Sequence, residues 1–86
     1  MSKLAFTERA WEEYTYWQAQ DKKTLKKINA LLKDIERNGH EGIGKPEQLK
    51  YEDNMWSRRI NDFDRLVYLL KDGIIEITQC KGHYDD

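Results

Sequence analysis

The sequence predicts one α+β domain over residues 1–86, an antiparallel β-sheet packed on one face by an N-terminal helical hairpin. Two stretches with helical spacing come early, and three stretches rich in β-branched and aromatic residues follow them. Each layer has one apolar face, so stacking the hairpin on the sheet is the economical way to bury both. A short strand before the first helix completes the predicted order of strand, helix, helix and three strands.

Composition excludes several classes of protein. Hydrophobic residues make up 38% of the 86 residues, enough for one modest core. Charged residues make up 36%, but the net charge of -1 excludes a globally basic nucleic-acid binder. One Cys excludes an internal disulfide, and two His with one Cys show no metal-ligand spacing, so no metal or cofactor is expected. No apolar run suits a signal peptide or a membrane span, so we expect a cytoplasmic protein without a membrane partner.

The first half of the chain predicts a strand at 3–6 and the helical hairpin. Thr7 is a good N-cap for a helix that begins at Glu8, and Asp21 is a good N-cap for a second helix that Asn38-Gly39 ends. Aromatic and small residues at helical spacing favour core packing of the first helix over base stacking. They are Ala10, Trp11, Tyr14 and Trp17. The short link at 19–20 favours an antiparallel hairpin.

The second helix has one apolar face and one basic face. The apolar positions are Leu25, Ile28, Leu31, Leu32 and Ile35, and the basic ones are Lys22, Lys23, Lys26, Lys27 and Lys33. Such a lysine cluster is either a solvated face or a surface that meets phosphates, and the sequence leaves both interpretations open.

Glycine and proline in 40–51 predict an irregular connection, after which 56–60, 65–70 and 74–80 read as strands. Asp72-Gly73 is a strong signal for a two-residue hairpin turn. The turn before it is flanked by Arg59 and Arg65. An odd loop length places both guanidinium groups on one face, nearly opposite each other, and an even length places them on opposite faces. Two guanidinium groups side by side on one face repel each other, so such a pair suggests a bound anion. The alternative is that both are solvated residues at the sheet edge.

Polar residues of the second half supply the groups for phosphodiester cleavage: a carboxylate, several cations and an imidazole. They are Glu47, Lys50, Arg59, Arg65, His83 and Tyr84. RNA would bring its own nucleophile in the 2′-OH, so this chemistry needs no metal. As spacing alone the signal is weak, because such residues occur in any soluble domain.

A set of segments in order along nearly the whole chain resembles the YoeB toxin family of type II toxin–antitoxin systems, in the RelE superfamily of mRNA interferases. The segments are 16–18, 26–29, 41–47, 56–60, 65–68 and 80–84. The resemblance implies a RelE-like fold and a ribosome-dependent endoribonuclease that cuts mRNA in the ribosomal A site. It implies that the 2′-OH attacks the adjacent phosphate, leaving a cyclic phosphate and a free 5′-OH.

The resemblance also implies a role for each matching position. Glu47 matches the general base, His83 the general acid and Arg65 the residue that stabilises the transition state. Tyr84 matches the aromatic residue that holds the substrate or leaving group. Two further positions, Lys50 and Arg59, match supporting cations that bind substrate. Asp85-Asp86 follow the His-Tyr pair at which the family usually ends.

The implied partners are a YefM-type antitoxin, the 70S ribosome with its mRNA, operator DNA through the antitoxin complex only, and a possible second copy of the chain. We expect the basic face of the second helix to contact ribosomal RNA. Two alternatives keep the fold: a ParE-like toxin directed at gyrase, and a non-enzymatic module that binds nucleic acid or protein. The set of Glu47, Arg65 and the His83-Tyr84 pair argues against a gyrase-directed toxin, which has no use for such a site.

The predicted register conflicts with a shared site. A two-residue turn at Asp72-Gly73 pairs Arg65 with Cys80, and strand alternation then turns His83 toward the opposite face from Arg65. Both can serve one site only if the loop is odd or the last strand carries a bulge. Gly82 is the predicted bulge position.

Overall fold

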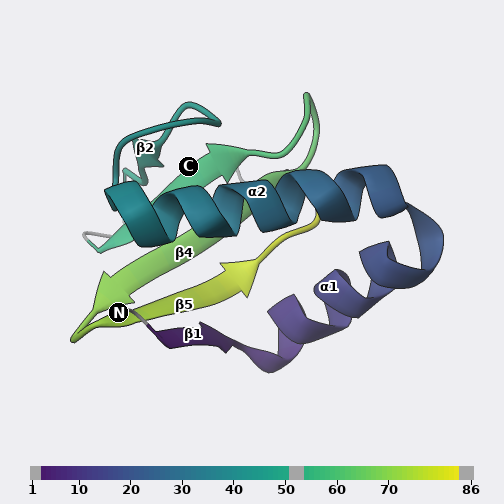
Figure 1. Cartoon of the computed structure of the whole chain (residues 1–86), viewed down its shortest axis with the longest axis horizontal. Coiled ribbons are helices and arrows are strands. Elements are labelled where there is room, and N and C mark those ends of the chain that lie inside the picture. Colours follow the sequence, from purple (N-terminus) through teal and green to yellow (C-terminus); the bar gives the residue numbers. More distant parts are fainter. Residues whose placement is uncertain (1–2, 51–53, 84–86) are drawn as a thin grey trace.

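The computed structural model describes residues 3–50 and 54–83. It contains β1 (Lys3–Phe6), α1 (Glu8–Gln20), α2 (Lys22–Asn38), β2 (Glu47–Gln48), β3 (Met55–Arg59), β4 (Arg65–Lys71) and β5 (Ile74–Gln79). The strands form one sheet in the order β1-β5-β4-β3-β2. The helical hairpin lies over one face of this sheet, with α2 crossing in front of the central strands (Figure 1). The predicted α+β class is confirmed. The described helices include none with the length and apolarity that crossing a membrane requires.

Two details of the sheet differ from the prediction. β1 pairs with β5 in parallel, so the sheet is mixed rather than wholly antiparallel. The amides of Lys3 and Thr7 donate to the carbonyls of Gly73 and Ile77, each over 2.9 Å, and these bonds seat β1 on the sheet edge. The second difference is β2, a two-residue strand that pairs with β3 inside the connection predicted to be irregular. Whether a short edge strand runs parallel or antiparallel depends on the strand beside it, and the local sequence pattern does not reveal which strand that is.

Both helices begin at the predicted caps. The Thr7 hydroxyl accepts a hydrogen bond from the Ala10 amide over 3.2 Å. The Asp21 carboxylate accepts from the amides of Lys23 and Thr24, and hydrogen bonding to Thr24 contributes most to holding its pKa below the usual range. The α2 helix ends at Gly39, whose φ of 66° lies in the left-handed region that glycine enters freely.

The core lies between α2 and the central strands. Ile28, Leu31 and Ile35 of α2 are buried with Leu66 and Tyr68 of β4. This packing uses the predicted apolar face of α2.

The predicted apolar stripe of α1 is only partly core. Trp17 is buried, and its indole N–H donates to the carbonyl of Cys80 over 2.8 Å. Trp11, in contrast, is 52% exposed, so its assignment to the core was wrong. Its ring stacks on that of Tyr14 in α1, with centroids 5.9 Å apart, and lies edge-on to that of Phe6 in β1. Because β1 ends the sheet there, this side of α1 has no further strand to cover it.

The sheet register decides whether Arg59 and Arg65 share one face of the sheet, and whether His83 faces the same side as Arg65. The loop 60–64 between β3 and β4 has an odd length, and Arg59 pairs directly with Arg65. The turn after β4 pairs Leu70 with Ile75, as predicted. Further along, Tyr68 pairs with Ile77 but Val67 pairs with Gln79.

The bulge in the last strand therefore lies at Thr78, and the predicted bulge at Gly82 and the pairing of Arg65 with Cys80 were wrong. The Thr78 hydroxyl donates to the Val67 carbonyl over 3.3 Å, which holds the extra residue against β4. Past this point, the Arg65 amide donates to the Gly82 carbonyl over 2.9 Å. The one-residue shift restores the alternation that His83 needs to face the same side as Arg65.

Candidate active site

Four of the predicted catalytic and substrate-binding residues meet in a hollow of about 210 Å³ on the sheet face opposite the helices. Arg58 reaches α2, and Leu66 belongs to the core, so strand alternation turns Arg59 and Arg65 to the other face. The hollow is lined by Lys45, Glu47, Leu49, Ser57, Arg59, Arg65 and His83.

The two cross-strand arginines give the hollow its cationic character. The Arg65 guanidinium donates to the carbonyls of Asn61 and Asp64 over 2.9 and 3.2 Å, so the turn anchors it. Over residues 3–50 and 54–83, neither Arg59 nor Arg65 forms a salt bridge. With Lys45, the lining carries three cations against the single carboxylate of Glu47, an arrangement that suits a bound anion.

Glu47 reaches the hollow because β2 pairs with β3, which places Glu47 opposite Ser57. The connection from α2 to β2 is tied to the core by Arg58, whose side chain is fully buried. Its guanidinium donates to the carbonyls of Gly39, Glu41 and Ile43 over 2.8, 2.8 and 3.0 Å. One buried cation thus supplies donors to three loop carbonyls at once.

Asp34 of α2 forms a salt bridge with Arg58 and also accepts from the Ile43 amide over 3.1 Å. Hydrogen bonding from Arg58 is the main cause that holds the pKa of Asp34 below its usual range. The helix, the loop and β3 therefore share one polar cluster, which fixes the start of β2 relative to the sheet.

Next to this cluster, Gly44 brings the loop into close contact with β3. Its carbonyl accepts from the Arg59 amide over 2.6 Å. Its φ is +81°, and a Cβ at this position would lie 2.7 Å from Cδ2 of Leu31. A residue with a side chain would have to adopt a strained backbone and displace the core.

His83 is held in place through its neighbour Gly82. The Gly82 amide donates to Oδ1 of Asp64 over 2.7 Å, and its carbonyl accepts from the Arg65 amide over 2.9 Å. Gln79 donates to the same carbonyl over 3.2 Å. The His83 side chain is exposed, with its ring centroid 6.2 Å from that of Phe63 in the β3–β4 turn.

The hollow thus brings together Glu47, Arg59, Arg65 and His83 of the predicted site residues. Lys50 is exposed just beyond β2 and does not line it, and Tyr84 lies outside the described residues. Sequence reasoning missed Lys45 and Ser57. Strand alternation from Arg59 would have found Ser57, whereas Lys45 follows a glycine in a loop and carries no periodic signal.

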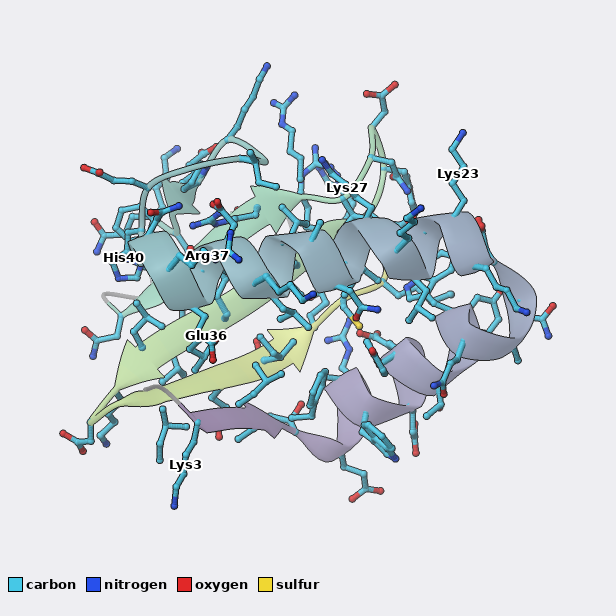
Figure 2. The ribbon with its side chains drawn as sticks, in the orientation of Figure 1. Lys3, Lys23, Lys27, Glu36, Arg37 and His40 are labelled. Carbon is cyan, nitrogen blue, oxygen red and sulfur yellow. The ribbon has the colours of Figure 1, made fainter. Side chains whose placement is uncertain are left out.

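All five lysines of α2 are exposed, and three of them border two different hollows. Lys23 and Lys27 project toward the β3–β4 turn (Figure 2) and line a second hollow with Ile60 and Asn61. Lys33 instead borders the apolar groove that contains Trp11.

The described part of the chain contains no group of three or more His, Cys, Asp or Glu side chains placed to hold a metal ion. Its lone thiol, Cys80, is buried beneath α1, and burial raises the pKa of Cys80 to about 12. The hollow itself offers the carboxylate of Glu47 and the imidazole of His83, beside the cations Lys45, Arg59 and Arg65.

A mixed sheet backed by a helical hairpin, with a cationic hollow on the face that the helices leave uncovered, places the chain in the RelE-like class of α+β folds. The chain belongs to the family of YoeB-like toxins of bacterial type II toxin–antitoxin systems, whose family model matches residues 6–84.

Individual relatives agree with this assignment. The chain is 48% identical over 83 residues to Toxin YoeB of Escherichia coli K12, covering 95% of this chain and 99% of that one. The YoeB dimer from Staphylococcus aureus is similar in structure, with a TM-score of 0.92 and 52% identity over 96% of this chain and 98% of that one. The toxin in the heterotetrameric YoeB–YefM complex from the same organism has a TM-score of 0.89 and 52% identity, with 98% and 99% covered.

Proposed function

We propose that this toxin is a ribosome-dependent endoribonuclease that cleaves mRNA in the ribosomal A site and so inhibits translation. The observation that supports this proposal is the meeting of Glu47, Arg65 and His83 around one hollow, from three separate parts of the sequence. A base, an acid and a fixed cation around one anion-sized space are what in-line cleavage of a phosphodiester requires.

In the proposed reaction, Glu47 removes the proton from the ribose 2′-OH, and the 2′ oxygen attacks the adjacent phosphorus. The bond to the 5′ oxygen breaks, and His83 donates a proton to that oxygen. The products are a 2′,3′-cyclic phosphate and a free 5′-OH. Because the substrate supplies the nucleophile, the proposal needs no metal ion.

The charge that builds up on the phosphate oxygens is stabilised by Arg65, with Arg59 and Lys45 beside it. Arg65 is suited to this role because the turn carbonyls already orient its guanidinium before substrate binds. Little reorganisation then remains for the reaction itself.

The size of the hollow supports a requirement for the ribosome. At about 210 Å³ it is smaller than the roughly 300–1,000 Å³ typical of small-molecule pockets, so it suits a phosphodiester group rather than a whole nucleotide. A net charge of -1 adds little general attraction for RNA. A ribosome that presents and aligns the mRNA would supply the positioning that the toxin lacks.

The proposed partners follow from the relatives. The toxin of the Staphylococcus aureus complex pairs with YefM, so we propose that a YefM-type antitoxin neutralises this chain and that operator DNA is bound only through their complex. A homodimer is proposed by analogy with the Staphylococcus aureus dimer.

The test is to map mRNA 5′ ends by primer extension after brief expression of the toxin. The parent chain should create new ends within translated codons, and a Glu47→Ala, His83→Ala double variant should not. Glu36→Ala is a matched carboxylate control, because Glu36 lies on α2, away from the hollow (Figure 2). Absence of new ends with the parent would reject the proposal, and double-strand breaks at gyrase sites would instead support the ParE-like alternative.

A further inference from the structure

We propose that Asp64 is a positioning residue that sets the place of His83 through the Gly82 peptide. This inference rests on the proposed function of the hollow and adds to it a residue that does not line the hollow. Asp64 immediately precedes Arg65, so one short segment would place both the acid and the cation.

Both carboxylate oxygens of Asp64 are engaged. Its Oδ1 accepts from the Gly82 amide over 2.7 Å, and its Oδ2 accepts from the side-chain amide of Asn61 over 2.9 Å. Asp64 is only 8% exposed, so water does not replace these bonds easily. A hydrogen bond to a charged acceptor in such a place is stronger than one between neutral groups.

Both backbone polar groups of Gly82 form hydrogen bonds with the segment 64–65. Its amide is bound by Asp64 and its carbonyl by the amide of Arg65. β5 ends at Gln79, so the described residues that follow, 80–83, lie beyond the regular strand. Gly82 has a φ of +92°, and glycine has little conformational preference of its own. Cys80 is held by hydrogen bonds with Glu13 and Trp17, and Gln79 also donates to the Gly82 carbonyl. The contacts with Asp64 and Arg65 add the restraint on the backbone directly before His83.

The Asn61 contact makes this restraint rigid. The side-chain oxygen of Asn61 accepts from the amides of Phe63 and Asp64 over 2.8 and 2.6 Å, which closes the turn, while its nitrogen donates to Asp64. Asp64 is thus fixed by the turn before it binds Gly82. The carboxylate connects the geometry of the β3–β4 turn to the position of the imidazole.

Catalysis would be sensitive to this connection. A general acid must lie within hydrogen-bond reach of the leaving oxygen, and misplacement by about 1 Å costs on the order of 100-fold in rate. We expect Asp64→Leu, which keeps the side-chain size and removes both acceptors, to slow single-turnover cleavage of ribosome-bound mRNA by about 10- to 100-fold. The ribosome concentration for half-saturation should stay unchanged.

Asp62→Leu is the matched control, because Asp62 is an exposed aspartate in the same turn. The same substitution there should leave the cleavage rate intact. A double variant, Asn61→Asp with Asp64→Asn, tests the bond itself. It rebuilds the Asn61–Asp64 contact with donor and acceptor exchanged and keeps an oxygen for the Gly82 amide. We expect it to recover most of the parent rate.

A second readout follows the contact directly and does not depend on activity. Hydrogen exchange of the Gly82 amide, measured by NMR, should be at least about tenfold faster in Asp64→Leu and unchanged in Asp62→Leu. If Asp64→Leu fails to fold, Asp64→Ala serves for both measurements, since it also removes both acceptor oxygens.

The outcomes separate the two proposals. If the parent does not cleave ribosome-bound mRNA, the proposed function and the role of Asp64 both fall. If the parent cleaves and a folded Asp64→Leu matches its rate, only the positioning role is overturned. A lowered melting temperature with an unchanged saturated rate would likewise show that Asp64 only stabilises the fold.

Discussion

The loop that leads to Glu47 depends on a glycine at position 44, and replacing it tests the tertiary contacts that place the base. In Gly44→Ala, the new Cβ would lie 2.7 Å from Cδ2 of Leu31 and 3.2 Å from Cβ of Arg58. The φ of +81° adds backbone strain of about 1–3 kcal/mol. Overpacking against the core adds about 1–3 kcal/mol more. We therefore expect a loss of about 2–6 kcal/mol in the free energy of unfolding.

Gly73→Ala is the matched control. Gly73 has a similar φ of +76°, but a Cβ there meets nothing within 4 Å. The free energy of unfolding of Gly73→Ala should fall only by the cost of the backbone strain, about 1–3 kcal/mol. The entropy that Ala removes from the unfolded chain is the same in both variants, so it cancels in the comparison.

Urea unfolding of the two variants and the parent measures this difference. Domains of 86 residues typically have a total stability of about 4–13 kcal/mol, so the loss in Gly44→Ala should be large enough to move the midpoint clearly. Gly44→Ala should also lower the cleavage rate, because Glu47 follows the displaced loop. Equal losses of stability in the two variants would refute the steric argument and show that the loop moves freely away from Leu31.

Three further predictions concern the hollow, the helix surface and the buried thiol. Arg65→Ala should fold and yet lower single-turnover cleavage on ribosomes by at least about 100-fold, as loss of a preorganised donor does. Neutralising Lys23 or Lys27 singly should weaken ribosome binding and flatten its salt dependence more than neutralising Lys33, which borders the apolar groove; equal slopes for the three single variants in binding titrations would contradict this. Burial raises the Cys80 pKa from 9.0 to about 12, so its contribution to stability is complete below pH 9 and lost as the pH rises toward 12. Urea unfolding measured between pH 9 and pH 12 should show that the stability lost in Cys80→Ala, relative to the parent, shrinks as the pH rises.

Local signals in the sequence determined much of this protein. Caps at Thr7 and Asp21, and a turn at Asp72-Gly73, lie where short-range hydrogen bonds and glycine conformations require them. The order of the helices and main strands followed from periodicity. The resemblance to YoeB toxins was also present in the sequence, and the family model confirms it.

Tertiary structure alone decided how the site is assembled. The bulge lies at Thr78, where the hydroxyl donates to the Val67 carbonyl on the neighbouring strand. Asp64 reads in the sequence as an ordinary turn residue, yet it holds a peptide 18 positions away. Trp11 is exposed because the sheet ends beside it. Each of these facts depends on which atoms of distant segments come within bonding distance, and local propensity contains no information about that distance.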